Sequence, residues 1–162
     1  MFDPSVRRWS VSKIAFWPTW QLVVTGAVAS LAGQFIIAEF MVRIFGDPTH
    51  IANLFDGHPK WLEIFITIVL APLYETLIFQ WAIMTLLHRL LRRSWLFAGI
   101  VSTVVFGLCH GYTDWRAISL ITTSATLAAV FAIEARRGGT PVVATVSTHA
   151  LFNGLVMCVH AV

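Results

Sequence analysis

The sequence predicts an all-α, polytopic membrane protein with about five transmembrane helices and an N-terminal interfacial segment. Of the 162 residues, 57% are hydrophobic and only 12% are charged, and the mean hydropathy is +0.77. A soluble domain has about a quarter of its residues charged. The apolar residues also fall into five runs near the length of roughly 20 residues that a helix needs to cross the hydrocarbon.

These runs are separated by short polar stretches, with no internal repeat and no linker, so we expect one integral membrane domain over residues 1–162. Residues 1–18 mix aromatic and basic side chains, which is typical of an interfacial segment rather than of a cleavable signal peptide. The predicted spans follow at about 20–45, 61–91, 94–112, 117–135 and 141–161.

Features of the sequence support each predicted span. The first pairs Gly26 with Ser30 and Ala29 with Gly33, small residues four positions apart that suit close helix contact. The second has about 30 residues, too many for an untilted crossing at about 1.5 Å per residue, so it should tilt or kink near Pro72. The third and fourth have close to the required length, and Gly-Thr-Pro opens the fifth.

The basic residues are distributed unequally between the two sides of the predicted membrane. Eight of the 11 Lys and Arg residues lie before the first span, at or beyond the end of the second, or after the fourth. The positive-inside rule therefore predicts that the N-terminus lies in the cytoplasm and the C-terminus outside. The net charge of +3 comes from these short stretches and not from a basic groove. We therefore expect the lipid bilayer, and no nucleic acid, as a partner.

One carboxylate lies deep within a predicted span. Glu75 is about 15 residues from either end of the second run, where an ionisable group costs about 2.5 to 3.5 kcal/mol on insertion scales. Such a residue should face the protein interior with polar partners, either as a functional group or as a neutral acid that bonds two helices. Glu39, Glu63 and Glu134 lie near span ends and are expected to reach the interface.

Two histidines on other spans are candidate partners for this glutamate. The stretch "VVFGLCHGYTD" places His110 near the end of the third span, with Phe106 four residues before it and Asp114 four after. All three share one face if the helix continues. The stretch "VSTHALFNGL" places His149 and Asn153 four apart on one face of the fifth span.

Helix geometry permits these groups to meet. Counted from the cytoplasmic side, Glu75 and His110 lie about 24 Å deep, Asn153 about 18 Å and His149 about 12 Å, so His149 is the outlier. A glutamate, two imidazoles and an amide can supply a base that activates water, a proton shuttle and donors for an oxyanion. Gln80, just over one turn beyond the glutamate, can orient a substrate backbone or a water.

Three motifs in this order, "PLYETLIFQ", "FGLCH" and "HALFN", resemble those of the CAAX protease and bacteriocin-processing family (CPBP, or ABI) of glutamic intramembrane proteases. The resemblance covers about 65–157 and implies a protease-like core there. It implies that Glu75 activates the attacking water, that His110 assists, and that His149 and Asn153 stabilise the oxyanion. It further implies a bacterial inner-membrane enzyme that needs no cofactor and cleaves a membrane protein or a C-terminal tail peptide.

The first motif departs from the family pattern at two positions. The family glutamate is usually followed by a second glutamate, three further residues and an arginine, and these positions hold Thr76 and Gln80 here. Because one acid and one base are lost together, the local charge stays balanced. The chain is also shorter than eight-span members, so it resembles a minimal core of a divergent subfamily.

Two other functions remain open from the sequence. Glu75, His110 and His149 could ligate zinc in a membrane hydrolase, since two histidines and a carboxylate with an open position make a catalytic zinc site. The His-Glu-x-x-His spacing that would strengthen this reading does not occur. The other function is a non-catalytic scaffold or immunity-type protein of the same fold, which Thr76 and Gln80 favour.

Overall fold

A computed structural model describes residues 16–46, 55–112 and 114–160, and these residues form helices and turns without a strand. Five helices follow one another along the chain: α1 (Thr19–Phe45), a continuous helix Lys60–Leu90 that we call the long helix, α4 (Trp95–Cys109), α5 (Arg116–Arg136) and α6 (Pro141–His160). Four are long and apolar enough to cross a membrane, and α4 is shorter. The predicted polytopic helical membrane protein is confirmed. The proposed interfacial segment 1–18 lies almost wholly outside the described residues.

The third predicted span, 94–112, is longer than the helix that forms. Helix α4 has 15 residues, about 22 Å at 1.5 Å per residue, against a hydrocarbon core of about 30 Å. It ends because Gly111 adopts a φ of 68°, a left-handed conformation that glycine tolerates and that terminates a helix. His110 is consequently the capping residue of α4.

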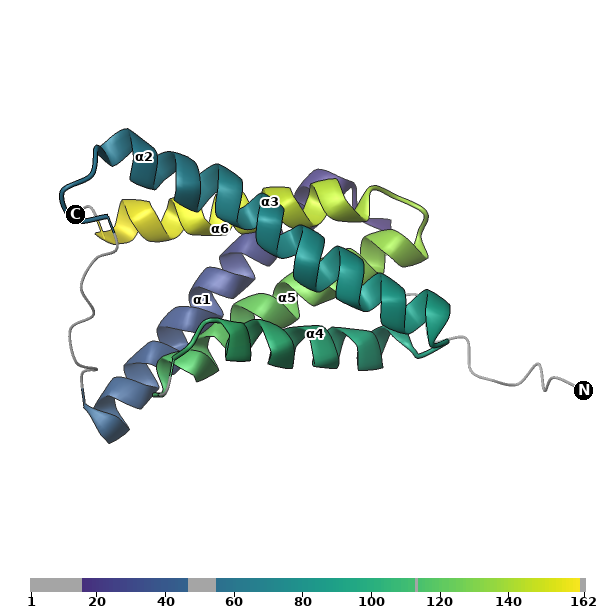
Figure 1. The fold of residues 1–162 in the computed structure, drawn as a ribbon, viewed down its shortest axis with the longest axis horizontal. Helices are drawn as coiled ribbons and strands as arrows, with labels where there is room; N and C mark the ends of the chain where they lie inside the picture. The colour runs from purple at the N-terminus through teal and green to yellow at the C-terminus, as the bar shows by residue number, and fades with distance from the viewer. Residues whose placement is uncertain (1–15, 47–54, 113, 161–162) are drawn as a thin grey trace, which may run out of the picture.

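The long helix contains π-helical turns on both sides of Pro72. It comprises α2 (Lys60–Phe65) and α3 (Ala71–Glu75), with π-helical stretches at Ile66–Leu70, Thr76–Ile83 and Leu86–Leu90. Ala71 donates its backbone N–H to the carbonyl of Ile66, one residue further back than in an α-helix. Proline lacks a backbone N–H and usually breaks a helix. Here the widened turn accommodates it, and the helix crosses the molecule obliquely (Figure 1).

The helices alternate in direction between two ends of the bundle. At one end, Arg137 after α5 binds the carbonyl of Trp17 and the Thr19 hydroxyl at the start of α1. At the opposite end, the indole N–H of Trp115 donates to the Gly46 carbonyl after α1 at 3.3 Å. The long helix and α5 both end at the first end (Figure 1), so Arg89, Arg92, Arg93 and Arg136 also lie there, and we call it the arginine-rich end.

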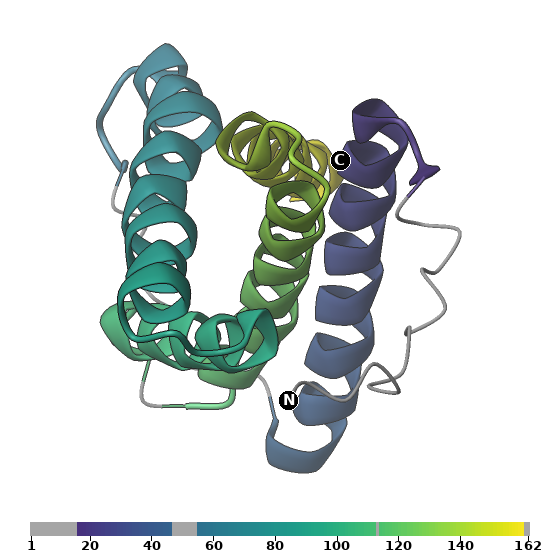
Figure 2. The ribbon, with the colours of Figure 1, turned by 90° about the vertical axis from the view of Figure 1, so that its right-hand side faces the viewer.

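Helix α5 lies at the centre of the bundle. It contacts α1, α4 and α6, and Figure 2 shows α5 and α6 between α1 on one side and the long helix on the other. One apolar cluster joins the long helix, α4 and α5 through Met84, Ala98, Ala128 and Phe131. Another joins α1, α5 and α6 through Leu22, Val130 and Ala144.

Three of the four small residues of α1 that were predicted to make close helix contacts face a neighbouring helix. A Cβ atom at Gly26 would lie 3.0 Å from methyl groups of Thr148 and Val130, so α6 and α5 approach α1 most closely there. Ser30 is buried, and a Cβ atom at Gly33 would lie 3.4 Å from that of Thr122 in α5, but Ala29 is exposed, so only Ala29 does not make the expected contact. Many large apolar side chains point outward, including Trp20, Ile36, Leu96 and Leu108 at 64–76% exposure, which suits lipid and not water.

Candidate active site

The structure brings Glu75 between the two candidate histidines. Glu75 is the last residue of α3, and its side chain is 25% exposed. Its Oε1 lies 3.9 Å from Nε2 of His110, and its Oε2 lies 3.7 Å from Nε2 of His149. The depth count made His149 the outlier, but the structure places its Nε2 beside the Glu75 carboxylate all the same.

The end of α4 orients the His110 ring. The backbone N–H of His110 turns back to Gly107, so it does not bond the carbonyl of Phe106 as a continued α-helix would require. That carbonyl instead lies 2.8 Å from His110 Nδ1. Because a carbonyl only accepts, Nδ1 carries the hydrogen of this contact, and Nε2 is the ring nitrogen that faces Glu75.

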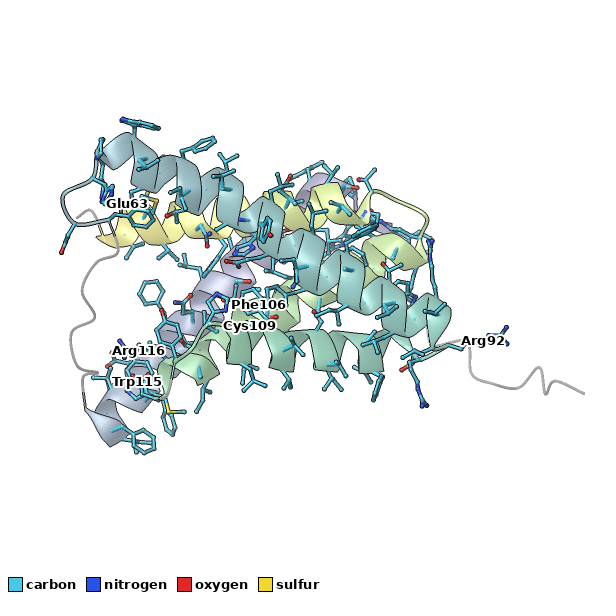
Figure 3. All side chains as sticks on the ribbon, viewed as in Figure 1. Glu63, Arg92, Phe106, Cys109, Trp115 and Arg116 are labelled. Atoms are coloured by element: carbon cyan, nitrogen blue, oxygen red, sulfur yellow. The ribbon has the colours of Figure 1, made fainter. Side chains whose placement is uncertain are left out.

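Phe106 packs against both imidazoles. Its ring centroid lies 4.3 Å from that of His110 and 6.4 Å from that of His149. It also meets Phe79 of the long helix edge-to-face at 5.0 Å. In Figure 3 the side chain of Phe106 lies on the side of α4 that faces the long helix. This predicted supporting residue is therefore placed to hold the two histidine rings at fixed positions.

Asn153 makes a contact that sequence reasoning missed. Its side-chain Nδ2 donates to the backbone carbonyl of Thr67 at 2.7 Å. In an α-helix this carbonyl would accept the backbone N–H of Ala71, but that N–H donates to Ile66 instead. In a π-helix the donor would be Pro72, which has no backbone N–H. The proline in the sequence was the available signal that a carbonyl of this turn would need a donor from elsewhere.

The two positions that depart from the family pattern are fully buried. Thr76 and Gln80 have 0% exposure, and within the described part of the chain the Thr76 hydroxyl and both polar atoms of the Gln80 amide have no hydrogen-bond partner. The same is true of Nδ1 of His149. Buried polar atoms are satisfied in about nine cases in ten. Within the described part of the chain, the other buried side-chain atoms without a partner belong to Ser30, Gln34, Thr123 and Ser124.

Asp114 does not join this group, because its expected placement required α4 to continue past His110. It lies in the turn before α5, where its carboxylate binds the Arg116 side chain and accepts the Arg116 backbone N–H at 2.9 Å. The side-chain hydrogen bond from Arg116 lowers the pKa of Asp114 below its usual value. The structure thus corrects the placement of Asp114, which binds the first residue of α5 instead.

Glu134 is also misplaced by the sequence argument. It was expected to reach the interface, but it has 0% exposure. Its carboxylate binds the Arg137 guanidinium and accepts the backbone N–H of Thr140 at 3.2 Å. It lies at the arginine-rich end and connects the end of α5 to the start of α6.

The described residues contain no group of three His, Cys, Asp or Glu side chains arranged to hold a metal ion. The zinc alternative therefore gains no support from the geometry of Glu75, His110 and His149.

Comparison with known families matches residues 57–155, more than half of the chain, to the family described as Rce1-like, type II CAAX prenyl endopeptidase. The matched segment includes Glu75, His110, His149 and Asn153. Searches of curated proteins and of solved structures found no match.

Proposed function

Because the chain belongs to the Rce1-like family of type II CAAX prenyl endopeptidases, we propose that it is an intramembrane endopeptidase whose attacking water is activated by Glu75. The substrate we propose is a membrane protein or the C-terminal tail of an anchored protein, and no cofactor besides water is required. One observation carries the catalytic part, namely the Glu75 carboxylate between two imidazole nitrogens at 3.7 and 3.9 Å.

These separations suit a water molecule at the carboxylate. Both exceed the usual limit of a hydrogen bond, about 3.2 Å, and a polar contact beyond about 3.5 Å is the range that a bridging water spans. The Glu75 side chain is a quarter exposed, so water and a substrate carbonyl can approach it. The anionic carboxylate would accept a proton of this water as the general base.

In the first step, the water oxygen forms a bond to the carbonyl carbon while one water proton passes to Glu75. The carbonyl π electrons move to its oxygen and produce a tetrahedral oxyanion. We assign His149 and the second amide N–H of Asn153 to this oxyanion, because the other amide N–H already binds Thr67. The burial of His149, 4% exposed, would strengthen that interaction.

In the second step, the oxyanion collapses, the carbon–nitrogen bond breaks and the leaving nitrogen takes up a proton. His110 is placed to transfer this proton from Glu75, because Phe106 holds the hydrogen on Nδ1 and leaves Nε2 to receive and return it. The products are a carboxyl group and an amine, and the base is restored. Gln80 would orient the substrate backbone or the water from its buried position.

The test compares purified full-length variants reconstituted in phospholipid vesicles. The probes are two quenched fluorescent peptides, one ending in a prenylated CAAX sequence and one with a transmembrane segment and a C-terminal tail. We expect Glu75→Gln and His110→Ala each to lower the cleavage rate by about 10²- to 10⁴-fold, the contribution of general acid–base catalysis. Glu63→Gln is the matched control, because it removes a carboxylate of the same helix that pairs with Lys60 far from the site.

Two results would overturn the proposal. Full activity in both Glu75→Gln and His110→Ala would exclude the assigned mechanism. A wild-type protein that cleaves neither probe, together with a cellular phenotype unchanged by Glu75→Gln, would favour the non-catalytic scaffold.

We further propose that the protein lies in a bacterial inner membrane with the arginine-rich end in the cytoplasm. The support is the positive-inside rule applied to the basic residues of that end. A reporter that is active only outside the cytoplasm, fused after residue 162, should be active. An inactive C-terminal fusion and an active N-terminal one would reverse this orientation.

A further inference from the structure

A groove runs along the outer surface between α4 and α5, on a different part of the molecule from Glu75. Its volume is about 480 Å³. Its floor consists of small residues such as Gly99, Ala125 and Ala129, and larger side chains such as Leu96 and Ile121 line it on either side. A Cβ atom at Gly99 would lie 3.5 Å from that of Ala128, so the two helices approach closely beneath the groove.

The groove faces the lipid. Leu96 is 75% exposed and Ile121 is 43% exposed, and in a helical membrane protein such apolar side chains contact acyl chains. Helix α4 is also too short to cross the hydrocarbon on its own. An acyl chain that lies along α4 would fill this groove, which no neighbouring helix covers in the described part of the chain.

One charged residue lines this apolar groove. Arg136 lies at its arginine-rich end and is exposed, and no partner for its guanidinium is found within residues 16–46, 55–112 and 114–160. The adjacent Arg137 differs, because it binds Glu134 and the Trp17 carbonyl. Trp95 lines the same end and stacks on His88 with ring centroids 3.9 Å apart, as expected of an aromatic residue at a membrane interface.

Charge decides between a lipid and a second copy of the chain as the occupant. Among the described carboxylates, only Glu134 lies at the arginine-rich end, and it is buried and already bound to Arg137. A second copy would therefore bring no accessible carboxylate to Arg136 from the described part of the chain. An anionic phospholipid brings a phosphate, which a guanidinium can bind bidentately, and basic pockets between transmembrane helices are typical sites for such headgroups.

We propose that this groove binds one anionic phospholipid, with an acyl chain between α4 and α5 and the phosphate at Arg136. The site is separate from the proposed peptidase chemistry, and its test does not depend on activity.

The test is native mass spectrometry of the full chain in detergent, titrated with phosphatidylglycerol or with zwitterionic phosphatidylethanolamine of the same acyl chains. We expect one phosphatidylglycerol to remain bound per chain, more tightly than phosphatidylethanolamine. Arg136→Gln should weaken phosphatidylglycerol binding about fivefold, the usual effect of one basic residue at a membrane surface. Arg89→Gln is the matched control, since Arg89 is exposed at the same end but does not line the groove, and it should change binding less than about twofold.

A second pair of variants tests the apolar part of the site. Ala129→Leu fills the groove and should weaken binding of both lipids, whereas Ala29→Leu adds the same side chain to an exposed position of α1 and should not. Equal loss of binding in Arg136→Gln and Arg89→Gln, or equal retention of the two lipids, would overturn the proposal. A wild-type dimer that Ala129→Leu dissociates would overturn it as well, because the groove would then be an interface between chains.

Discussion

Asn153 of α6 donates its side-chain amide to the main-chain carbonyl of Thr67 in the long helix, at 2.7 Å. The contact lies between a residue assigned to the oxyanion and the widened turn that precedes Pro72 and Glu75. It therefore connects the two helices that carry His149 and Glu75. Asn153 is a positioning residue in this respect, in addition to its proposed role in the reaction.

The link between Asn153 and Pro72 can be measured by a double-mutant cycle. Asn153→Ala should lower the free energy of unfolding by about 1 kcal/mol, the net value of one hydrogen bond. Pro72→Ala restores a backbone N–H that can bond a carbonyl of the same turn, so Asn153→Ala should cost less in that background. Unfolding in mild detergent, followed by circular dichroism, supplies the four free energies. Strictly additive effects would show that Pro72 is not the reason why the Thr67 carbonyl lacks a backbone donor.

Gln80 should limit stability. Its amide is fully buried with neither polar atom bonded to a described residue, and such a group costs about 1 to 3 kcal/mol. Gln80→Met keeps the length of the side chain and removes the amide, so the unfolding temperature should rise while cleavage slows. Gln21→Met, at a partly exposed position of α1, is the control and should leave both unchanged. A lower unfolding temperature in Gln80→Met would mean that the amide is well bonded in the folded protein.

The fold class and the central carboxylate could be predicted from the sequence because each depends on local information. Five apolar runs are enough to indicate membrane helices, and the depth of Glu75 in its run is visible without a structure. Motifs on three spans were enough to indicate a family, and the match over 57–155 confirms that resemblance.

The parts that could not be predicted depend on a few backbone angles. The left-handed conformation of Gly111 ends α4 at Cys109, and this removes Asp114 from the face of Phe106 and turns the His110 ring onto the Phe106 carbonyl. The π-helical turn before Pro72 creates the acceptor for Asn153. The burial of Glu134 depends on its pairing with Arg137, which in turn binds the start of α1 through the Trp17 carbonyl and the Thr19 hydroxyl, and the position of Glu134 near a span end does not indicate these long-range contacts.

The proposed mechanism uses no metal, so removal of divalent cations should not affect it. Prolonged dialysis against EDTA, followed by 1,10-phenanthroline, should leave the cleavage rate of the vesicle assay unchanged. Elemental analysis of the active protein should find far less than one zinc per chain. Loss of activity that added Zn²⁺ restores would instead support ligation by Glu75 and the two histidines.

Asp114 should make stability depend on pH in the acidic range. Its folded-state pKa is lowered by the hydrogen bond from Arg116, so its contribution is present above the unfolded pKa, 3.8, and is lost as the pH falls through the lower folded value. Asp114→Asn should thus have a lower unfolding temperature than the wild type at pH 7, and the difference should shrink as the pH falls below 3.8. The effect should be small because both side chains of the pair are partly exposed to solvent. A difference that does not shrink as the pH falls below 3.8 would show that the ionised carboxylate is not its source.

Substitutions at two glycines can separate the effect of the His110 ring orientation on cleavage from the effect of backbone strain on stability. Gly111 after α4 and Gly138 after α5 both have a positive φ, 68° and 71°, and a Cβ atom at either would meet nothing within 4 Å. Alanine at each position should therefore lower the free energy of unfolding by a similar amount, about 1 to 2 kcal/mol from left-handed strain alone. Only Gly111→Ala should also lower the cleavage rate, because relaxing that strain changes the backbone that directs His110 Nδ1 to the Phe106 carbonyl. Thermal unfolding and the vesicle cleavage assay on the two variants provide the comparison. Equal cleavage rates at equal loss of stability would mean that the end of α4 does not control the histidine.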